Sequence, residues 1–243
     1  MSESSVVPAD ASIDHAASIS YWNSVSPSVD GMLGGFPHIS RIDLRGSQTF
    51  LAKLRRSSGR QSTELLAHAV DCGAGIGRVT FGFLLKVAQT VDIVEPIEKF
   101  TQQLQEQEGA KELIDSGRIG TQYNVGLETW DRSELENQAY KYDLIWNQWC
   151  VGHLTDSQLV AYFQRCKRFL ASNGWIVVKE NLSTDAQGDD IYDEVDSSVT
   201  RTDEKFRSLF AQGGLKIVAT EIQRGFPNEL YPVRMYALRP EST

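Results

Sequence analysis

The sequence predicts an α/β fold built on a doubly wound, mostly parallel sheet, and three observations carry that prediction. Short apolar runs alternate with segments of helical periodicity, as in βαβ units. The run at 67–71 leads into three glycines at alternate positions, Gly73, Gly75 and Gly77, just before a helical segment. A second apolar run, 91–95, ends in the carboxylate Glu95, about 20 residues after the glycines. In such sheets a ribose-binding acid follows the second strand at this distance. Together these features predict a site for an adenosyl-type cofactor.

The other elements follow from periodicity and from turn residues. We expect strands at 67–71, 91–95, 119–123, 142–146, 175–179, 215–222 and 233–238. We expect helices at 78–85, 98–107, 157–171 and 206–212, two of which stop at Asn173-Gly174 and Gly213-Gly214. The last two strands are joined by a short link with Gly and Pro, so they should form an antiparallel hairpin.

Length and composition indicate a single globular domain. The chain has 243 residues, of which 41% are hydrophobic and 23% charged. We expect a flexible N-terminus over 1–12 and one domain over 13–243, divided into a helical N-terminal extension (13–60) and a Rossmann-like core (61–243). The sequence has no apolar run near 18 residues, which predicts a soluble protein of the cytoplasm, and also of the nucleus, with no membrane partner.

Charge and cysteine content narrow the possible partners. The net charge of −8 argues against a nucleic-acid partner, whose phosphates need a basic surface, and tolerates a cationic substrate. Three cysteines, Cys72, Cys150 and Cys166, lie in strand-like or helix-like runs. They indicate reduced, packed thiols, with no disulfide framework and no metal site.

The strand count and the glycine spacing narrow the fold further. Seven strands ending in a hairpin are typical of the class I S-adenosylmethionine-dependent methyltransferase fold. A dinucleotide site usually has the pattern G-x-G-x-x-G, whereas this chain has G-x-G-x-G preceded by Asp71. The alternatives are a ligand-free strand-to-helix turn for the glycines and a solvated strand end for Glu95.

Several segments, spread from about Tyr21 to Arg239, carry a more specific pattern. They are YW at 21–22, VDGMLGG at 29–35, DCGAGIGR at 71–78, WNQWCVGHL at 146–154, VKEN at 178–181, VDSSV at 195–199 and ELY at 229–231. This pattern closely resembles the eukaryotic α-N-terminal protein methyltransferases, which modify chains beginning Xaa-Pro-Lys after removal of the initiator methionine. The tail YPVRMYAL at 231–238 resembles the fungal branch of that family.

The resemblance implies S-adenosyl-L-methionine as the cofactor, with S-adenosyl-L-homocysteine as the product. The implied cofactor-binding residues are Gly73, Arg78, Glu95, Leu127, Glu128 and Gln148. In this assignment Arg78 pairs with the methionyl carboxylate and Glu95 binds both ribose hydroxyls. Leu127 and Glu128 lie at the adenine edge, and Gln148 lies beside the sulfonium. Animal members carry glutamine at the position of Glu128 and aspartate at that of Glu95.

Two residues match the catalytic positions of the family. Methyl transfer to an amine requires a neutral amine aligned behind the sulfonium, and Asp196 and His153 are implied to assist its deprotonation. His153 has an alternative role as a hydrogen-bonded histidine at a helix start, because Thr155-Asp156 resembles an N-cap. Asp196 lies in an acidic run from Asp189 onward, and such a run is usually a solvated loop.

A further set of residues is implied to bind the peptide. The set comprises Trp22, Leu33, Ile39, Trp149, Asn181, Asp193, Ser198, Leu230 and Tyr231. Trp149 would form a flat wall for the proline ring, closed by apolar neighbours, and Asp193 would hold the third-position lysine. Trp22 has an alternative role as a simple contact onto the core.

The resulting prediction is methylation of the α-amino group of Xaa-Pro-Lys N-termini, to the di- or trimethylated state, with ribosomal proteins among the substrates and a monomeric enzyme. A small-molecule methyltransferase is the first alternative, but it would not need the acidic cluster at 193–198. A non-catalytic S-adenosylmethionine-binding scaffold is the second, and Asp196 with His153 argues against it. A dehydrogenase is disfavoured by the glycine spacing.

Overall fold

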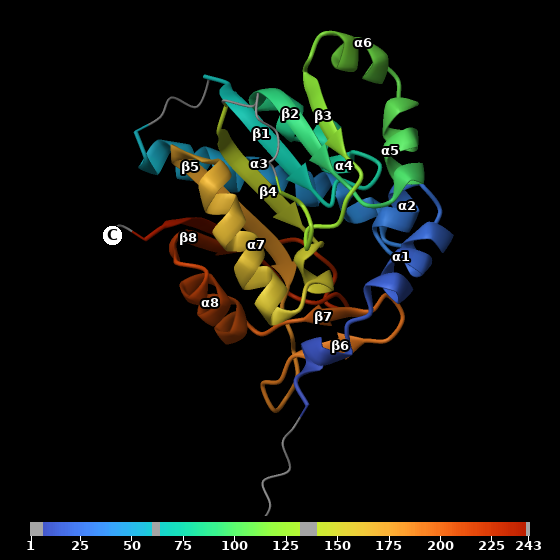
Figure 1. Cartoon of the computed structure of the whole chain (residues 1–243), viewed down its shortest axis with the longest axis vertical. Coiled ribbons are helices and arrows are strands. Elements are labelled where there is room, and N and C mark those ends of the chain that lie inside the picture. Colours follow the sequence, from blue (N-terminus) through green and yellow to red (C-terminus); the bar gives the residue numbers. More distant parts are fainter. Residues whose placement is uncertain (1–6, 60–63, 132–139, 242–243) are drawn as a thin grey trace, which may run out of the picture.

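A seven-stranded sheet forms the centre of the protein (Figure 1). The computed structural model describes residues 7–59, 64–131 and 140–241. The sheet has the strand order β3-β2-β1-β4-β5-β9-β8. Its strands are β1 (Leu66–Cys72), β2 (Ala88–Val94), β3 (Ile119–Tyr123), β4 (Tyr142–Gln148), β5 (Leu170–Asn181), β8 (Leu215–Ile222) and β9 (Val233–Pro240).

Strands β1 to β5 pair in parallel, whereas β9 runs antiparallel to both of its neighbours, β5 and β8. The predicted seven-stranded sheet with a C-terminal antiparallel hairpin is therefore confirmed. The strand order changes direction between β1 and β4, and in such sheets the crevice at the carboxyl ends of these strands is the usual ligand site.

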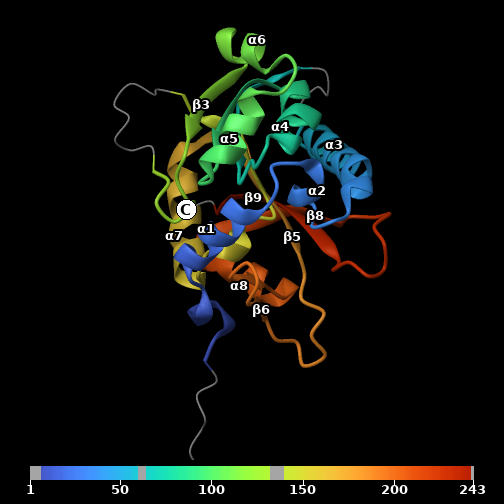
Figure 2. The same cartoon turned by 90° about the vertical axis from the view of Figure 1, so that its right-hand side faces the viewer.

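Helices cover both faces of the sheet (Figure 2). The helices are α3 (Ser40–Ser57), α4 (Arg78–Gly82), α5 (Glu98–Gln105), α6 (Ala110–Asp115), α7 (Asp156–Phe169) and α8 (Asp203–Gln212). One hydrophobic cluster contains residues of α3, α4 and α5, and a second contains residues of α7 and α8. Trp146 and Trp175 belong to the first cluster and Trp130 to the second, so these three tryptophans are core residues, as expected.

The structure also differs locally from the sequence prediction. The helix expected at 78–85 ends at Gly82 and is followed by a 3₁₀ turn, Leu84–Lys86, because Phe83 leaves the helical region at φ −140°. Helix α6 was not expected. The acidic run, expected to be a loop, contains a two-stranded hairpin of β6 (Ile191–Asp193) and β7 (Ser198–Thr200).

The N-terminal segment lies against that hairpin at one end of the sheet (Figure 1). It contains a 3₁₀ turn (Ala9–Ser12), α1 (His15–Ser24), α2 (Val29–Met32) and a second 3₁₀ turn (Pro37–Ile39). The backbone N–H of Asp14 donates to Ser197 Oγ, and Asp10 Oδ2 accepts from the backbone N–H of Asp156. The 3₁₀ turn and its contacts differ from the flexible end expected up to residue 12, whereas residues 1–6 lie outside the described part.

No helix within 7–59, 64–131 or 140–241 is long and apolar enough to cross a membrane. In the same ranges, no group of three or more His, Cys, Asp or Glu side chains is arranged to hold a metal ion.

A buried arginine joins β7 to the 3₁₀ turn Val151–His153 that precedes α7. Arg201 is fully buried, and its guanidinium donates to the carbonyl oxygens of Val151 (3.2 Å) and Leu154 (2.5 Å). Its Nε also pairs with Asp156 Oδ1 at 2.9 Å. The guanidinium thus gives the carbonyl of Leu154 a partner and adds a second donor to the carbonyl of Val151, which also accepts from the N–H of Leu154.

We predict that Arg201→Met lowers the free energy of unfolding by about 3 kcal/mol, because it leaves a carboxylate and two carbonyl groups without their buried partner. The measurement is urea unfolding followed by circular dichroism. Arg207→Met is the matched control. Arg207 forms an exposed i,i+4 pair with Asp203, so its loss should change stability by less than about 0.5 kcal/mol. Equal effects of the two substitutions would contradict the prediction.

Candidate active site

A cavity of about 390 Å³ opens at the carboxyl edge of the sheet. Its floor is formed by the turn after β1 and by the ends of β2, β4 and β5, and residues of α1, α2 and the hairpin complete its walls. This is the crevice that the strand order predicts as a ligand site.

The turn after β1 requires glycine. Gly73, Gly75 and Gly77 all have positive φ, at 69°, 55° and 82°. A Cβ on Gly73 would lie 2.4 Å from the Cβ of Cys150, and one on Gly75 would lie 2.7 Å from Met32 Sδ. The backbone can follow this path against the neighbouring segments because these residues lack side chains.

Glu95 follows β2 and points at the glycine turn. Its side chain is only 5% exposed, and it accepts hydrogen bonds from the backbone N–H groups of Gly75 (2.8 Å) and Ile97 (2.9 Å). Burial raises the pKa of Glu95 to about 7, although both hydrogen bonds oppose the rise. A carboxylate in this state gains stability from further donors, such as a pair of hydroxyl groups.

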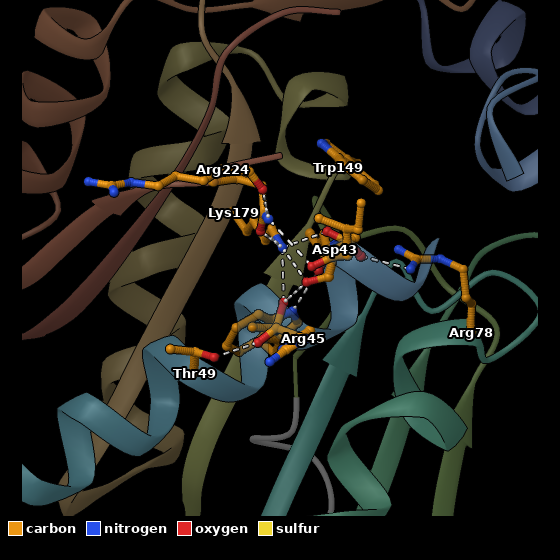
Figure 3. A network of polar contacts seen from close by, with 12 residues as sticks. Asp43, Arg45, Thr49, Arg78, Trp149, Lys179 and Arg224 are labelled. Atoms are coloured by element: carbon orange, nitrogen blue, oxygen red, sulfur yellow. Dashed lines mark hydrogen bonds and ion pairs between the residues drawn. The ribbon is translucent and has the colours of Figure 1, made fainter. Parts of the chain in front are cut away.

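Arg78 contacts the buried carboxylate of Asp43, a residue that the sequence motifs do not identify (Figure 3), and Gln148 contacts the same carboxylate. Arg78 Nη1 lies 2.7 Å from Asp43 Oδ2, and Gln148 Nε2 donates to both carboxylate oxygens. A signal was available. Asp43 occupies the same helix face as the buried residues Ser47, Phe50, Leu51 and Leu54 of α3. An acid on an apolar helix face indicates a buried partner of opposite charge.

Leu127 and Glu128 lie beyond the end of β3 and both line the cavity. Leu127 is 6% exposed and belongs to the core. The carboxylate of Glu128 folds back over Gly126, where a Cβ would lie 2.2 Å from Glu128 Oε2. The predicted contact of these residues with adenine stays a prediction.

Trp149 stands on an unusual turn after β4. Its φ is +54°, a left-handed conformation that L-residues rarely adopt. Three consecutive residues at the end of β5 hold the turn: Lys179 O accepts from Trp149 N, Glu180 Oε1 accepts from the backbone N–H groups of Cys150 and Val151, and Asn181 Oδ1 accepts from Trp149 Nε1. Burial raises the pKa of Glu180 to about 7. The segment VKEN carries the family pattern, but sequence analysis gave Glu180 no role.

His153 connects the cavity to α1. Its Nε2 accepts a hydrogen bond from Trp22 Nε1 at 3.2 Å, and its Nδ1 lies 3.0 Å from Ser18 Oγ. Because an indole N–H only donates, the proton of a neutral His153 must be on Nδ1. Burial lowers the pKa of His153 below its ordinary value of 6.5, against the attraction of Asp196. The imidazole is therefore neutral near pH 7.

Asp196 presents a carboxylate oxygen without a partner. Its Oδ1 is buried and accepts no hydrogen bond from any described residue, yet Asp196 lines the cavity. The next residue, Ser197, has φ +56° and is fixed through its Oγ by the backbone N–H of Asp14 and by Tyr192. The left-handed turn at Ser197 thus holds Asp196, with its buried and unpartnered carboxylate oxygen, at the wall of the cavity.

The structure brings the predicted residues together with one exception. Within the extension, Trp22, Leu33 and Ile39 line the cavity, and from the rest of the chain Asn181, Ser198, Leu230 and Tyr231 do so. Asp193 is exposed and does not line the cavity, because its Oδ1 instead accepts from the backbone N–H of Val195 in the hairpin turn.

The site fits S-adenosylmethionine in its donor and acceptor groups. The glycine turn lets backbone approach a ligand closely. The buried Glu95 can accept from two hydroxyl groups, and Arg78 lines the cavity with donors for a carboxylate. Glu95 thus matches the ribose hydroxyls and Arg78 the carboxylate of the cofactor, while the glycine turn leaves room for the cofactor beside the backbone.

Comparison with known protein families and curated proteins also indicates an S-adenosylmethionine-dependent methyltransferase. Residues 10–239 match the family described as AdoMet dependent proline di-methyltransferase. The chain is 45% identical to alpha N-terminal protein methyltransferase 1 of Schizosaccharomyces pombe, over 94% of this chain and 97% of that protein. It is 43% identical to N-terminal Xaa-Pro-Lys N-methyltransferase 1-A of Xenopus laevis, over 90% of this chain and 92% of that protein.

Solved structures support the fold. A SAM-dependent methyltransferase from Leishmania major is similar with a TM-score of 0.78 and 32% identity, covering 92% of this chain and 82% of that one. A magnesium protoporphyrin IX methyltransferase from Synechocystis, solved with SAM bound, shares the fold at a TM-score of 0.58 and 15% identity, covering 98% and 99%.

The raised pKa of Glu95 leads to a prediction about stability. The ordinary pKa of this carboxyl is 4.5 and that of the folded protein about 7. The folded state therefore binds the proton more tightly, and the stability that this proton contributes is complete below the ordinary pKa and is lost as pH rises through about 7. Glu95→Gln does not have this loss. The free energy of unfolding of the variant, relative to that of the wild type, should therefore rise by on the order of 3 kcal/mol between about pH 5 and about pH 8.

The measurement is urea unfolding of both ligand-free proteins across this pH range. Glu98→Gln, at an exposed position three residues away, should keep a constant difference from the wild type. A pH-independent difference for Glu95→Gln would show that burial does not raise the pKa of this carboxyl.

Proposed function

Because this chain belongs to the AdoMet-dependent proline di-methyltransferase family, we propose that it methylates the α-amino group of proteins whose processed N-terminus is Xaa-Pro-Lys. One observation in the structure carries the proposal. Residues of the glycine turn, Asp196 and Trp149 all line the same cavity. A site for a cofactor, an acceptor for an amine proton and a flat apolar wall thus share one space.

The chemistry requires a neutral amine at the moment of transfer. S-adenosylmethionine, when bound, supplies an electrophilic methyl group on a sulfonium. An α-amino group titrates near pH 8, so its deprotonation is only slightly uphill at neutral pH. The carboxylate of Asp196, a residue that lines the cavity, can accept that proton directly or through one water molecule.

His153 contributes differently. Its Nε2 lone pair already accepts from Trp22, so in this state it is not free to take the proton of the amine. Its role here is to hold α1 over the cavity through Trp22 and Ser18, close to Asp196. It can act as a base only when the hydrogen bond from Trp22 opens.

The peptide side of the cavity fits a proline followed by a cation. The ring of Trp149 offers a flat apolar surface, with Leu33, Ile39 and Leu230 in the same cavity. Asn181 lies beside that ring and bonds to its N–H. Asp193, the residue that the family resemblance assigns to the third-position lysine, is exposed in the hairpin, outside the cavity lining.

The finer parts of the proposal rest on the family resemblance. They are a di- or trimethylated product, ribosomal proteins among the substrates, a monomeric enzyme, and a location in the cytoplasm and nucleus. More than one methyl group requires space around the acceptor nitrogen.

The deciding experiment is mass spectrometry of a hexapeptide beginning Ser-Pro-Lys, incubated with the protein and S-adenosylmethionine. Two companion peptides serve as controls, one with Pro replaced by Ala and one with an acetylated α-amine. Mass gains of whole methyl units on the first peptide alone support the proposal. A gain on the acetylated peptide would place the methyl group elsewhere, and no gain on any peptide would indicate another acceptor.

We predict that Asp196→Asn lowers turnover by about a hundredfold or more, since the amide cannot take a proton, while cofactor affinity stays nearly unchanged. Steady-state kinetics and calorimetric titration with S-adenosylhomocysteine measure the two quantities. Glu194→Gln, an exposed neighbour in the same turn, should keep turnover within about twofold. Near-normal turnover of Asp196→Asn would remove Asp196 from the mechanism.

A further inference from the structure

Asp43 is the most completely buried acid beside the cavity, and neither the family pattern nor the sequence motifs assign it a role. It lies in the first turn of α3, in the N-terminal extension, with no exposed surface. Its carboxylate contacts three side chains from three other elements, namely Arg78 of α4, Gln148 of β4 and Lys179 of β5 (Figure 3).

The two cations around Asp43 are used differently. Lys179 is fully buried, and its ammonium contacts Asp43 Oδ1 (2.5 Å), Asp43 O (3.0 Å), Ser47 Oγ (3.0 Å) and Gln223 Oε1 (2.9 Å). These oxygens account for all three donors of the ammonium. Lys179 is not among the residues that line the cavity.

Arg78 does line the cavity, and its side chain is only 8% exposed. One terminal nitrogen donates to Asp43 at 2.7 Å, and the guanidinium carbon lies 5.5 Å from the centre of the Trp149 ring. A guanidinium has five N–H donors in a fixed plane. Anchoring one nitrogen on Asp43 therefore fixes the direction of the others.

Two cationic groups contact the carboxylate of Asp43 directly, and all three side chains are buried or nearly so. Asp71 also attracts Arg78, and burial lowers the pKa of Lys179. Arg78 is the cation of this cluster that lines the cavity, so its remaining donors are the ones that an α-carboxylate bound there would meet.

We propose that Asp43 is a positioning residue for the cofactor: it holds Arg78 and Gln148 so that the remaining guanidinium donors face the cofactor's α-carboxylate. The inference rests on the proposed role of Arg78 in cofactor binding. It also makes the N-terminal extension, through α3, part of the cofactor site as well as of the peptide site.

An amide in place of this carboxylate could not accept the same hydrogen bonds. Its single oxygen cannot serve Lys179, Arg78 and Gln148 together, and its NH₂ group would face their donors. Asp43→Asn should therefore release Arg78 from its fixed direction while keeping the volume of the side chain.

The test is calorimetric titration of the ligand-free proteins with two ligands. S-adenosylhomocysteine carries the α-carboxylate, whereas 5′-methylthioadenosine shares the adenosine and the thioether but lacks the amino-acid end. In Asp43→Asn we expect the Kd of S-adenosylhomocysteine to rise by about tenfold or more, the scale of a lost charge-assisted contact. The Kd of 5′-methylthioadenosine should stay within about twofold. Equal weakening of both ligands, or no weakening of either, would overturn the proposal.

Two further variants keep the test decisive. If Asp43→Asn does not fold, the double variant Asp43→Asn with Lys179→Met removes the buried cation that would be left uncompensated, and it should show the same selective loss. Arg78→Met separates this inference from the proposed function on which it rests. If Arg78→Met weakens S-adenosylhomocysteine selectively but the Asp43 variants do not, only the role of Asp43 fails. If Arg78→Met binds S-adenosylhomocysteine like the wild type, the assignment of Arg78 itself fails.

Discussion

The buried ion pair between Asp43 and Lys179 joins the two parts of this protein. Asp43 belongs to α3 in the N-terminal extension and Lys179 to β5, an interior strand of the sheet, and neither side chain has exposed surface. Burial acts to raise the pKa of Asp43, but Lys179 and Arg78 outweigh it and lower the pKa. Such a pair is costly to desolvate, and one partner alone would be far worse. The ion pair therefore fixes the position of the extension on the sheet. The residues of the extension that line the cavity are positioned by the same contact.

Buried acids organise the carboxyl edge of the sheet. Glu95 accepts from the backbone of the glycine turn and Glu180 from the backbone after Trp149, whereas Asp71 accepts from the side-chain hydroxyl of Thr80 at 2.6 Å. Burial raises the pKa of Asp71 to about 6 and those of the other two to about 7. Asp196 is the acid at this edge whose Oδ1 finds no donor among the described residues. Glu95 and Glu180 are thus occupied by hydrogen bonds from the backbone, whereas Asp196 lines the cavity with one carboxylate oxygen unpartnered.

The sequence was sufficient for the sheet and for most of the cavity, because both depend on local patterns. Apolar runs, glycine spacing and the acid after β2 are visible within about 30 residues, the length of a βαβ unit. Asp43 and Lys179 could not be placed in the same way, since they meet across more than a hundred positions and both residue types are usually exposed. The hairpin of β6 and β7 was hidden because its residues read as a solvated acidic run. Within that run, Asp193 lies at the surface and Asp196 lines the cavity, and the turn between them produces this difference.

Trp149 and Ser197 are the described non-glycine residues with left-handed φ, and both lie beside the cavity. Glycine would relieve the backbone at either position. At Ser197 the exchange would also delete the Oγ that receives Asp14, and at Trp149 it would delete the aromatic ring itself. A stabilising substitution at either position would thus have to relieve the backbone and still keep the side-chain contacts that shape the cavity.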